Sequence, residues 1–410
     1  MKPEIEKRIT MKLTYRSTML ACYNGYITQA ICINLAPLLY LTFQRSYGLT
    51  IGQISLLIAV NFAVQLAIDL VASLFARSMN LRLCIVFAHF SSVLGLMGLA
   101  VFPEIMPPLW GLLLAEALLG VGGGFTEVVI SPLMEACPTE GKSGNMSLLH
   151  SFYCWGQAGV VLFSGIFFHF FNIDTYWQYL PFFWAIVPFM GAIAFCFVPI
   201  YKLPSDETKA KEGSVRGLFA NPLFISFLLM MLCAGASEMI MSQWASNFVE
   251  SALGVEKSLG DLLGPCMFAL MMALCRVFYG KFSERIHLKR MMLGSCFLCI
   301  VAYLLAAFAP HPALSLVGCA LCGFSVGIFW PGTLSYASSK LPGASLAMFA
   351  LLAVAGDSGC LIGPPLAGSV AGFFAGELRY AFLFALIFPI INIVVLLWGR
   401  KQKRKDGKLS

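Results

Sequence analysis

The sequence predicts an all-α polytopic membrane protein with twelve transmembrane helices arranged as two six-helix bundles. Hydrophobic residues make up 59% of the 410 residues and charged residues only 11%, whereas soluble proteins carry about 25% charged residues. Apolar stretches long enough to cross a bilayer as helices recur along almost the whole chain. Because no water-soluble core could bury this much apolar surface, the composition excludes a soluble protein.

The apolar stretches fall into two sets of six. The first set of predicted helices covers residues 18–41, 50–75, 83–102, 108–135, 145–171 and 177–198. The second set covers residues 222–249, 259–281, 289–309, 312–338, 344–373 and 379–399. Helix breakers inside these stretches predict bends in helices that move, at Pro37, Pro132, Pro331, Gly363, Pro364 and Pro365.

A polar segment separates the two sets. It reads YKLPSDETKAKEGSVR from Tyr201 to Arg216 and is the longest polar stretch between predicted helices. We therefore predict four parts, an N-terminal bundle over 1–200, a cytoplasmic linker over 201–220, a C-terminal bundle over 221–400 and a basic cytoplasmic tail over 401–410.

The basic residues predict the orientation, because lysine and arginine concentrate in cytoplasmic loops. If both termini are cytoplasmic, only Arg45, Lys257, Arg276 and Arg379 of the 27 lysines and arginines lie outside the cytoplasmic segments. The polar start before residue 18 runs into the first predicted helix without a small-residue cleavage site, which is typical of a signal anchor. We expect a multi-pass protein of the inner (plasma) membrane.

Several other functions are excluded at this stage. The net charge of +7 follows from the loop asymmetry, so it does not indicate nucleic-acid binding. The 14 cysteines are scattered through apolar helices without the spacing of a zinc site or a disulfide framework. There is no phosphate-binding loop or nucleotide motif, so we expect no enzyme activity, no cofactor and no metal. Nothing requires more than a monomer.

Internal similarity at an offset of about 200 residues indicates a duplication, as in transporters built from parallel repeats. Gly156 to Gly159 of the fifth predicted helix corresponds to Gly356 to Gly359 of the eleventh. The short loops after the second and eighth helices also correspond, with Arg77 opposite Arg285.

The loop GKFSERIHLKR, from Gly280 to Arg290, resembles the loop motif of the major facilitator superfamily, in which Gly280, Glu284 and Arg285 occupy motif positions. The resemblance implies the major facilitator fold and a gating role for these charges in tying the cytoplasmic helix ends together. The first-half copy departs from the motif at Ala72 and Ala76.

A finer resemblance is to the fucose and glucose/galactose permease branch. It is carried by GGGFTEVVISP in the fourth helix, LLHSFYCWG in the fifth, GASEMIMSQW in the seventh and GDSGCLIGPPLAG in the eleventh. By this similarity Glu127 occupies the position of a proton-linked glutamate. The branch carries an Asn-Asp pair in the first helix, where this sequence has Asn34-Leu35, so one expected carboxylate is absent.

Acids inside membrane helices are costly and therefore rare without a function. The predicted helices contain Asp69, Glu116, Glu127, Glu238 and Asp357. Glu127 shares a helical face with glycines at 120 and 124 and with the serine at 131, which would open space beside the carboxylate. We predict that Glu127 couples transport to protons; the alternative is a structural hydrogen bond to a neighbouring helix.

Further polar and aromatic groups are candidates for substrate contact. The resemblance places Glu238 in the central cavity, where a sugar hydroxyl could donate to it, and Trp244 could stack on the ring or belong to an interfacial belt. The candidate substrate-binding residues are Asn34, Tyr153, Trp155, Gln157, Glu238, Trp244, Trp330 and Asp357. His150 is a second candidate for proton transfer, because imidazole titrates near neutral pH.

The remaining candidates concern gating and charge balance. Asp69 lies near Arg77, which favours gating over binding. Asp357 lies between two glycines, where we expect close contact between helices, and it could be structural or a ligand. Arg276 is the single lysine or arginine that lies inside a predicted helix away from its ends, and it could balance one acid or an anionic substrate. The excess of acids favours protons or cations over an anionic substrate.

We therefore predict a secondary active transporter that imports a small polar solute, a monosaccharide first, by proton symport with alternating access. Its partners would be this small molecule, protons and the lipid bilayer, with the cavity lined by helices four, five, seven, ten and eleven. One alternative is proton-coupled efflux of amphipathic or cationic compounds. Another is a substrate sensor that keeps the fold without transport.

Overall fold

The computed structural model describes residues 14–75, 79–171, 173–201, 215–253, 266–308, 311–341, 345–374 and 377–406. Every regular element in these ranges is a helix. Ten stretches of helix in the described residues are long and apolar enough to cross a membrane, and two of them, Ala313–Lys340 and Leu378–Trp398, each join two consecutive helices. The two other predicted spans correspond to α2 (Tyr15–Tyr47) and α13 (Met267–Phe282). The predicted all-α polytopic fold is confirmed.

Contacts divide the chain into two compact units. The first contains the described residues of 1–140 and 159–207, and the second those of 141–158 and 208–410. Helix α6 (Lys142–Phe170) therefore contributes its first half to the second unit and its remainder to the first. The predicted bundles over 1–200 and 221–400 stay a prediction, and the compact units differ from them at residues 141–158.

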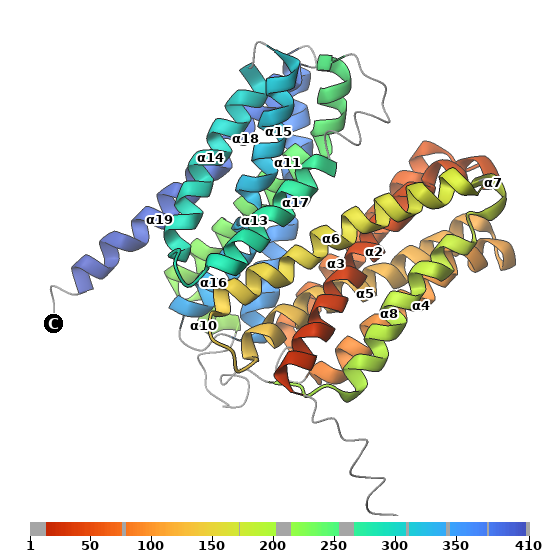
Figure 1. The fold of residues 1–410 in the computed structure, drawn as a ribbon, viewed down its shortest axis with the longest axis horizontal. Coiled ribbons are helices and arrows are strands. Elements are labelled where there is room, and N and C mark those ends of the chain that lie inside the picture. Colours follow the sequence, from red (N-terminus) through yellow and green to blue (C-terminus); the bar gives the residue numbers. More distant parts are fainter. Residues whose placement is uncertain are drawn as a thin grey trace, which may run out of the picture. The chain divides into compact units, whose positions relative to one another are not determined.

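The first unit is built around α5, which contacts α2, α3 and α4, while α8 contacts α2 and α4 (Figure 1). Its helices besides α2 and the end of α6 are α3 (Ile51–Phe75), α4 (Leu81–Ile105), α5 (Pro108–Ala136), the short α7 (Ile173–Tyr176) and α8 (Tyr179–Phe197). Small residues allow close approach: a Cβ at Gly111 would lie 2.6 Å from the carbonyl carbon of Phe102. Such glycine contacts are typical of membrane helices.

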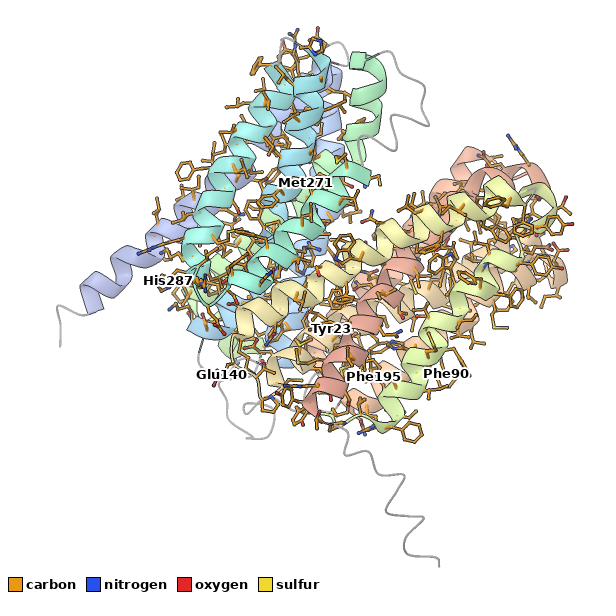
Figure 2. The ribbon with its side chains drawn as sticks, in the orientation of Figure 1. Tyr23, Phe90, Glu140, Phe195, Met271 and His287 are labelled. Carbon is orange, nitrogen blue, oxygen red and sulfur yellow. The ribbon has the colours of Figure 1, made fainter. Side chains whose placement is uncertain are left out.

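Apolar side chains fill the interior of the first unit and also cover its surface. Phe195 on α8 is fully buried, whereas Phe90 on α4 is 45% exposed; both are labelled in Figure 2. Trp110 and Phe163 are exposed as well. Apolar residues on the outside fit a protein whose solvent is lipid.

Arg82 is hydrogen-bonded to the C-terminal end of α8, the end that is predicted to be cytoplasmic. Its Nη1 atom donates to the carbonyl oxygens of Phe195 and Cys196 at 2.8 and 2.6 Å, and Nη2 donates to that of Val198 at 2.9 Å. The last carbonyls of a helix have no intrahelical donor. A planar guanidinium can satisfy several of them at once.

The second unit contains, within the described ranges, the first half of α6 and nine further helices (Figure 1). These are α10 (Val215–Phe219), α11 (Pro222–Leu253), α13, α14 (Leu288–Phe308), α15 (Pro312–Val326), α16 (Phe329–Lys340), α17 (Leu346–Phe373), α18 (Leu378–Ala385) and α19 (Ile387–Asp406). Helix α11 packs along α17, and α15 packs along α13 and α14. Ser345 caps the start of α17 by accepting a hydrogen bond from the Met348 amide.

Two predicted helices are interrupted, and proline accounts for both interruptions. The span predicted over 312–338 breaks between α15 and α16 because Pro331 has no N–H to donate to the Gly327 carbonyl four residues earlier. The span predicted over 379–399 breaks at Leu386, three residues before Pro389. The helix breaker identified at Pro331 accounts for the first interruption, whereas the interruption at Leu386 was not predicted.

Other boundaries differ by smaller amounts. Helix α2 extends beyond the predicted 18–41 to Tyr47, where Gly48 ends it with φ 66°, a conformation that glycine adopts without strain. The predicted linker contains α10, and α19 continues into the predicted tail as far as Asp406. Residues 254–265, which include the start of the span predicted over 259–281, lie outside the described residues.

Candidate proton and substrate sites

Glu127 lies on α5 in the first unit, where two glutamines hold one of its carboxylate oxygens. Gln29 on α2 donates from Nε2 to Oε2 at 2.7 Å, and Gln65 on α3 donates to the same oxygen at 2.8 Å. Both glutamines are buried, while Glu127 is half-buried. Hydrogen bonds to an ionised carboxylate are stronger than those between neutral groups. The two amides can therefore stabilise the charged form without neutralising it.

The small residues beside Glu127 bring helices together instead of opening space. A Cβ at Gly120 would lie 2.6 Å from the carbonyl oxygen of Asn61 on α3, and one at Gly124 would lie 3.1 Å from that of Gln65. Ser131 is hydrogen-bonded to the Tyr26 hydroxyl of α2 at 2.8 Å. The expectation of free space along this face was wrong, because α3 and α2 fill it.

Within the described residues, Asn34 makes no hydrogen bond to Glu127, Gln29 or Gln65. Its Nδ2 atom donates to the carbonyl oxygen of Ala30 in its own helix at 2.9 Å. The side chain is half-buried. Asn34 is therefore a separate candidate for substrate contact.

Arg276 organises the polar interior of the second unit. Nη2 lies 3.5 Å from Oε2 of Glu238 on α11, and the two side chains are 3% and 17% exposed. Nε donates to the carbonyl oxygen of Gly327 at 3.0 Å, and Nη1 donates to that of His150 at 3.0 Å and to Sγ of Cys154 at 2.9 Å. Of the two alternatives for Arg276, the structure shows the balance of an acid, and Glu238 is that acid.

The candidates on α6 do not all lie on one side of the helix. His150, Tyr153 and Gln157 are separated by three and four residues and share a face. His150 is 4% exposed, and the other two are half-buried. Trp155 is 40% exposed, and two residues of helix turn it to the opposite side. The structure therefore separates Trp155 from the others.

Both candidate tryptophans of the second unit pack against glycines of α17. Trp244 donates from Nε1 to the carbonyl oxygen of Pro364 at 3.2 Å, and its ring lies against Gly368. The Trp330 ring lies against Gly356, where a Cβ would collide with it. Both indoles are half-buried.

Asp357 lies at the predicted close contact between helices. Gly356 approaches Gly235 of α11, and Gly359 approaches the carbonyl oxygen of Leu232. The expectation of close helix packing around Asp357 is confirmed. The aspartate itself is half-buried.

The gating candidates are only partly described. Asp69 on α3 is fully buried, and Arg77 lies outside the described residues. Gly280 packs on α6, where a Cβ would lie 3.2 Å from Cβ of Leu148. Glu284 and Arg285 are exposed beyond the end of α13.

Gln29 and Gln65 are site residues that the sequence analysis missed. The signal available in the sequence was an amide side chain within an apolar helix, but this signal does not identify the acid that the amide binds. For metals, the described residues contain no group of three or more His, Cys, Asp and Glu side chains that could hold an ion.

The chain is similar to solved transporters over almost its full length. FucP in the outward conformation aligns with a TM-score of 0.79 at 16% identity, covering 93% of this chain and 98% of FucP. A point variant of the E. coli fucose:proton symporter FucP aligns at 0.78 and 15%, covering 94% and 99%. The proton:xylose symporter XylE bound to 6-bromo-6-deoxy-D-glucose aligns at 0.78 and 11%, covering 94% and 95%.

These identities show a shared fold. No curated protein matches the sequence significantly. The Major Facilitator Superfamily model matches residues 17–364 and 266–410. The chain is therefore a multi-pass membrane protein that belongs to the Major Facilitator Superfamily of transporters.

Proposed function

We propose that this transporter imports a small neutral polar solute, a monosaccharide first, by proton symport with alternating access. The observation that carries the proposal is the Glu127 carboxylate, half-buried in a membrane helix and held by Gln29 and Gln65. Such a group can be ionised while the amides donate to it and can be neutralised by one proton. Proton binding therefore changes the charge at this point by one unit, which is what coupling requires.

A neutral substrate fits the charge distribution of the second unit. The positive charge of Arg276 is already engaged by Glu238 and by carbonyl oxygens of the protein. An anionic substrate would need a basic group that is not engaged in this way. Half-buried Asn34, Tyr153, Gln157 and Asp357 remain as hydrogen-bonding candidates for sugar hydroxyls.

The roles of the aromatic and gating residues are part of the same proposal. Trp244 and Trp330 are candidate stacking surfaces for the apolar side of a sugar ring. His150 is a secondary proton-transfer candidate. Asp69, Arg77, Gly280, Glu284 and Arg285 are the gating candidates.

Similar solved structures support the choice of substrate class. FucP is named a fucose:proton symporter, and XylE is named a proton:xylose symporter. Membership of a transporter family also agrees with the prediction that the chain is not an enzyme. The distribution of basic residues supports an orientation in the inner (plasma) membrane with both termini cytoplasmic, and we further propose that the transporter is a monomer.

Transport by purified protein in liposomes tests the proposal. Labelled fucose, galactose, glucose and xylose, with an organic cation beside them, are offered under an inward proton gradient and again without a gradient. We expect one sugar to accumulate only with the gradient. Extrusion of the cation against an opposite gradient, with no sugar movement, would show efflux instead. Binding of a sugar without accumulation would indicate a sensor.

A further inference from the structure

A second acid lies on the helix face of α5 that carries Glu127. Glu116 precedes Glu127 by eleven residues, which is about three turns and about 16 Å along the axis, so both side chains leave the helix in nearly the same direction. Glu116 is 1% exposed. It also lies about 12 Å from the start of α5 at Pro108, well inside the span.

The groups in contact with Glu116 are neutral. Asn61 on α3 donates from Nδ2 to Oε2 at 2.8 Å, and the Tyr40 hydroxyl on α2 interacts with the carboxyl group. Oε1 accepts no hydrogen bond from any residue within the described ranges. An ionised carboxylate buried without a cation is strongly disfavoured, so the geometry favours a carboxylic acid with the proton on Oε1.

Among the described residues, no basic side chain is hydrogen-bonded or ion-paired to Glu116, whose side-chain partners are Asn61 and Tyr40. Cys32 on α2 is the further titratable group near Glu116. On α4, Arg82 donates to the end of α8, His89 is hydrogen-bonded to the carbonyl of Ile85, and Glu104 accepts from Tyr47. On α3 the group that faces Glu116 is the neutral amide of Asn61.

The two acids are joined through α3. Asn61 and Gln65 are four residues apart on one face of α3, and they donate to Glu116 and Glu127 respectively. Within the described part of the chain, Oε1 of Gln65 and Oε1 of Gln29 are also buried without a hydrogen-bond donor. Three buried acceptors therefore lie among α2, α3 and α5, and water molecules are donors that could satisfy them.

We propose that Glu116 is a second proton-binding site, which exchanges its proton with water on the outer side as the transporter cycles. On uptake an O–H bond forms at Oε1 with a proton from water. On release this bond breaks and the proton returns to water, leaving a carboxylate held by Asn61. Half-buried Tyr40, seven residues before the end of α2, connects the acid to the outer side in the proposed topology. The role in transport rests on the function proposed above.

Infrared spectroscopy of the protein in liposomes tests proton binding without any substrate. Glu127→Gln is compared with the double variant Glu127→Gln, Glu116→Gln, since glutamine keeps an oxygen that accepts from Asn61. We expect the double variant to lack one carboxylic-acid C=O band, and we expect this band in the single variant to decrease reversibly as the pH is raised. If no band is lost, Glu116 is ionised. A band that stays constant while the protein remains folded would show a fixed structural acid. Either result overturns the proposal.

Transport by Glu116→Gln alone then separates the two proposals. We expect unchanged thermal stability and a changed pH profile of uptake. An unchanged profile together with unchanged stability would contradict a role in the cycle. The variant Glu116→Ala also removes the contact to Asn61, so its loss of uptake shows how much a purely structural change lowers transport. If Glu127→Gln retains coupling, the function proposed for Glu127 fails, whatever the infrared result.

Discussion

Arg276 donates a hydrogen bond from Nε to the carbonyl oxygen of Gly327 at 3.0 Å, at the interruption between α15 and α16. Pro331 deprives this carbonyl of its helical donor. The guanidinium therefore serves two purposes, because it donates to a buried carbonyl that lacks its helical donor and it balances the charge of Glu238. Arg276 thus joins the helix break before Pro331 to the buried charge of Glu238.

Arg276→Met should lower stability substantially, because it leaves the Glu238 charge and the Gly327 carbonyl without their donor. Breaking a buried ion pair typically costs about 3 to 5 kcal/mol. The measurement is the unfolding temperature of purified protein in detergent. In a Pro331→Ala background the loss should be smaller, since the backbone N–H that the substitution restores can donate to Gly327. An equal decrease in unfolding temperature in both backgrounds would show that the contact between Arg276 and Gly327 does not contribute to stability.

Gly120→Ala should destabilise the first unit, because its Cβ would lie 2.6 Å from the Asn61 carbonyl oxygen. Overpacking of this kind costs about 1 to 3 kcal/mol. Gly165→Ala on α6 is the matched control, since nothing lies within 4 Å of the added atom. It should be neutral or slightly stabilising. Equal unfolding temperatures for the two variants would contradict the close contact of α3 and α5.

Arg82→Lys should loosen the end of α8 although the charge is kept, because an ammonium cannot reproduce the forked contact with three carbonyls. Hydrogen bonds from a charged donor are worth about 1.5 to 3 kcal/mol. Hydrogen exchange at residues 195–198 should increase. The exposed Arg290→Lys serves as control. Unchanged exchange in Arg82→Lys would indicate that these contacts are not formed in the membrane.

Sequence reasoning reached the fold and several parts of the site, and particular residues show where it stopped. Glu127 and Arg276 stood out because charges in apolar helices are costly. Their partners could not be assigned, since Gln29 and Gln65 come from other helices, and pairing depends on tertiary packing.

The break at Gly327 was predictable from Pro331, and the separation of Trp155 was predictable from the helical period of 3.6 residues per turn. The glycines beside Glu127 allowed two interpretations, because a free space beside the carboxylate and a close contact between helices both require glycine.

Uptake and exchange by Glu127→Gln test the central claim most directly. Wild-type protein and the variant are reconstituted in liposomes, and accumulation under a proton gradient is measured beside equilibrium exchange of the same sugar. We predict that the variant retains exchange and loses accumulation, because binding and conformational change continue while the coupling proton has no carboxylate at position 127 to bind. Accumulation by the variant at the wild-type level would contradict proton coupling through Glu127.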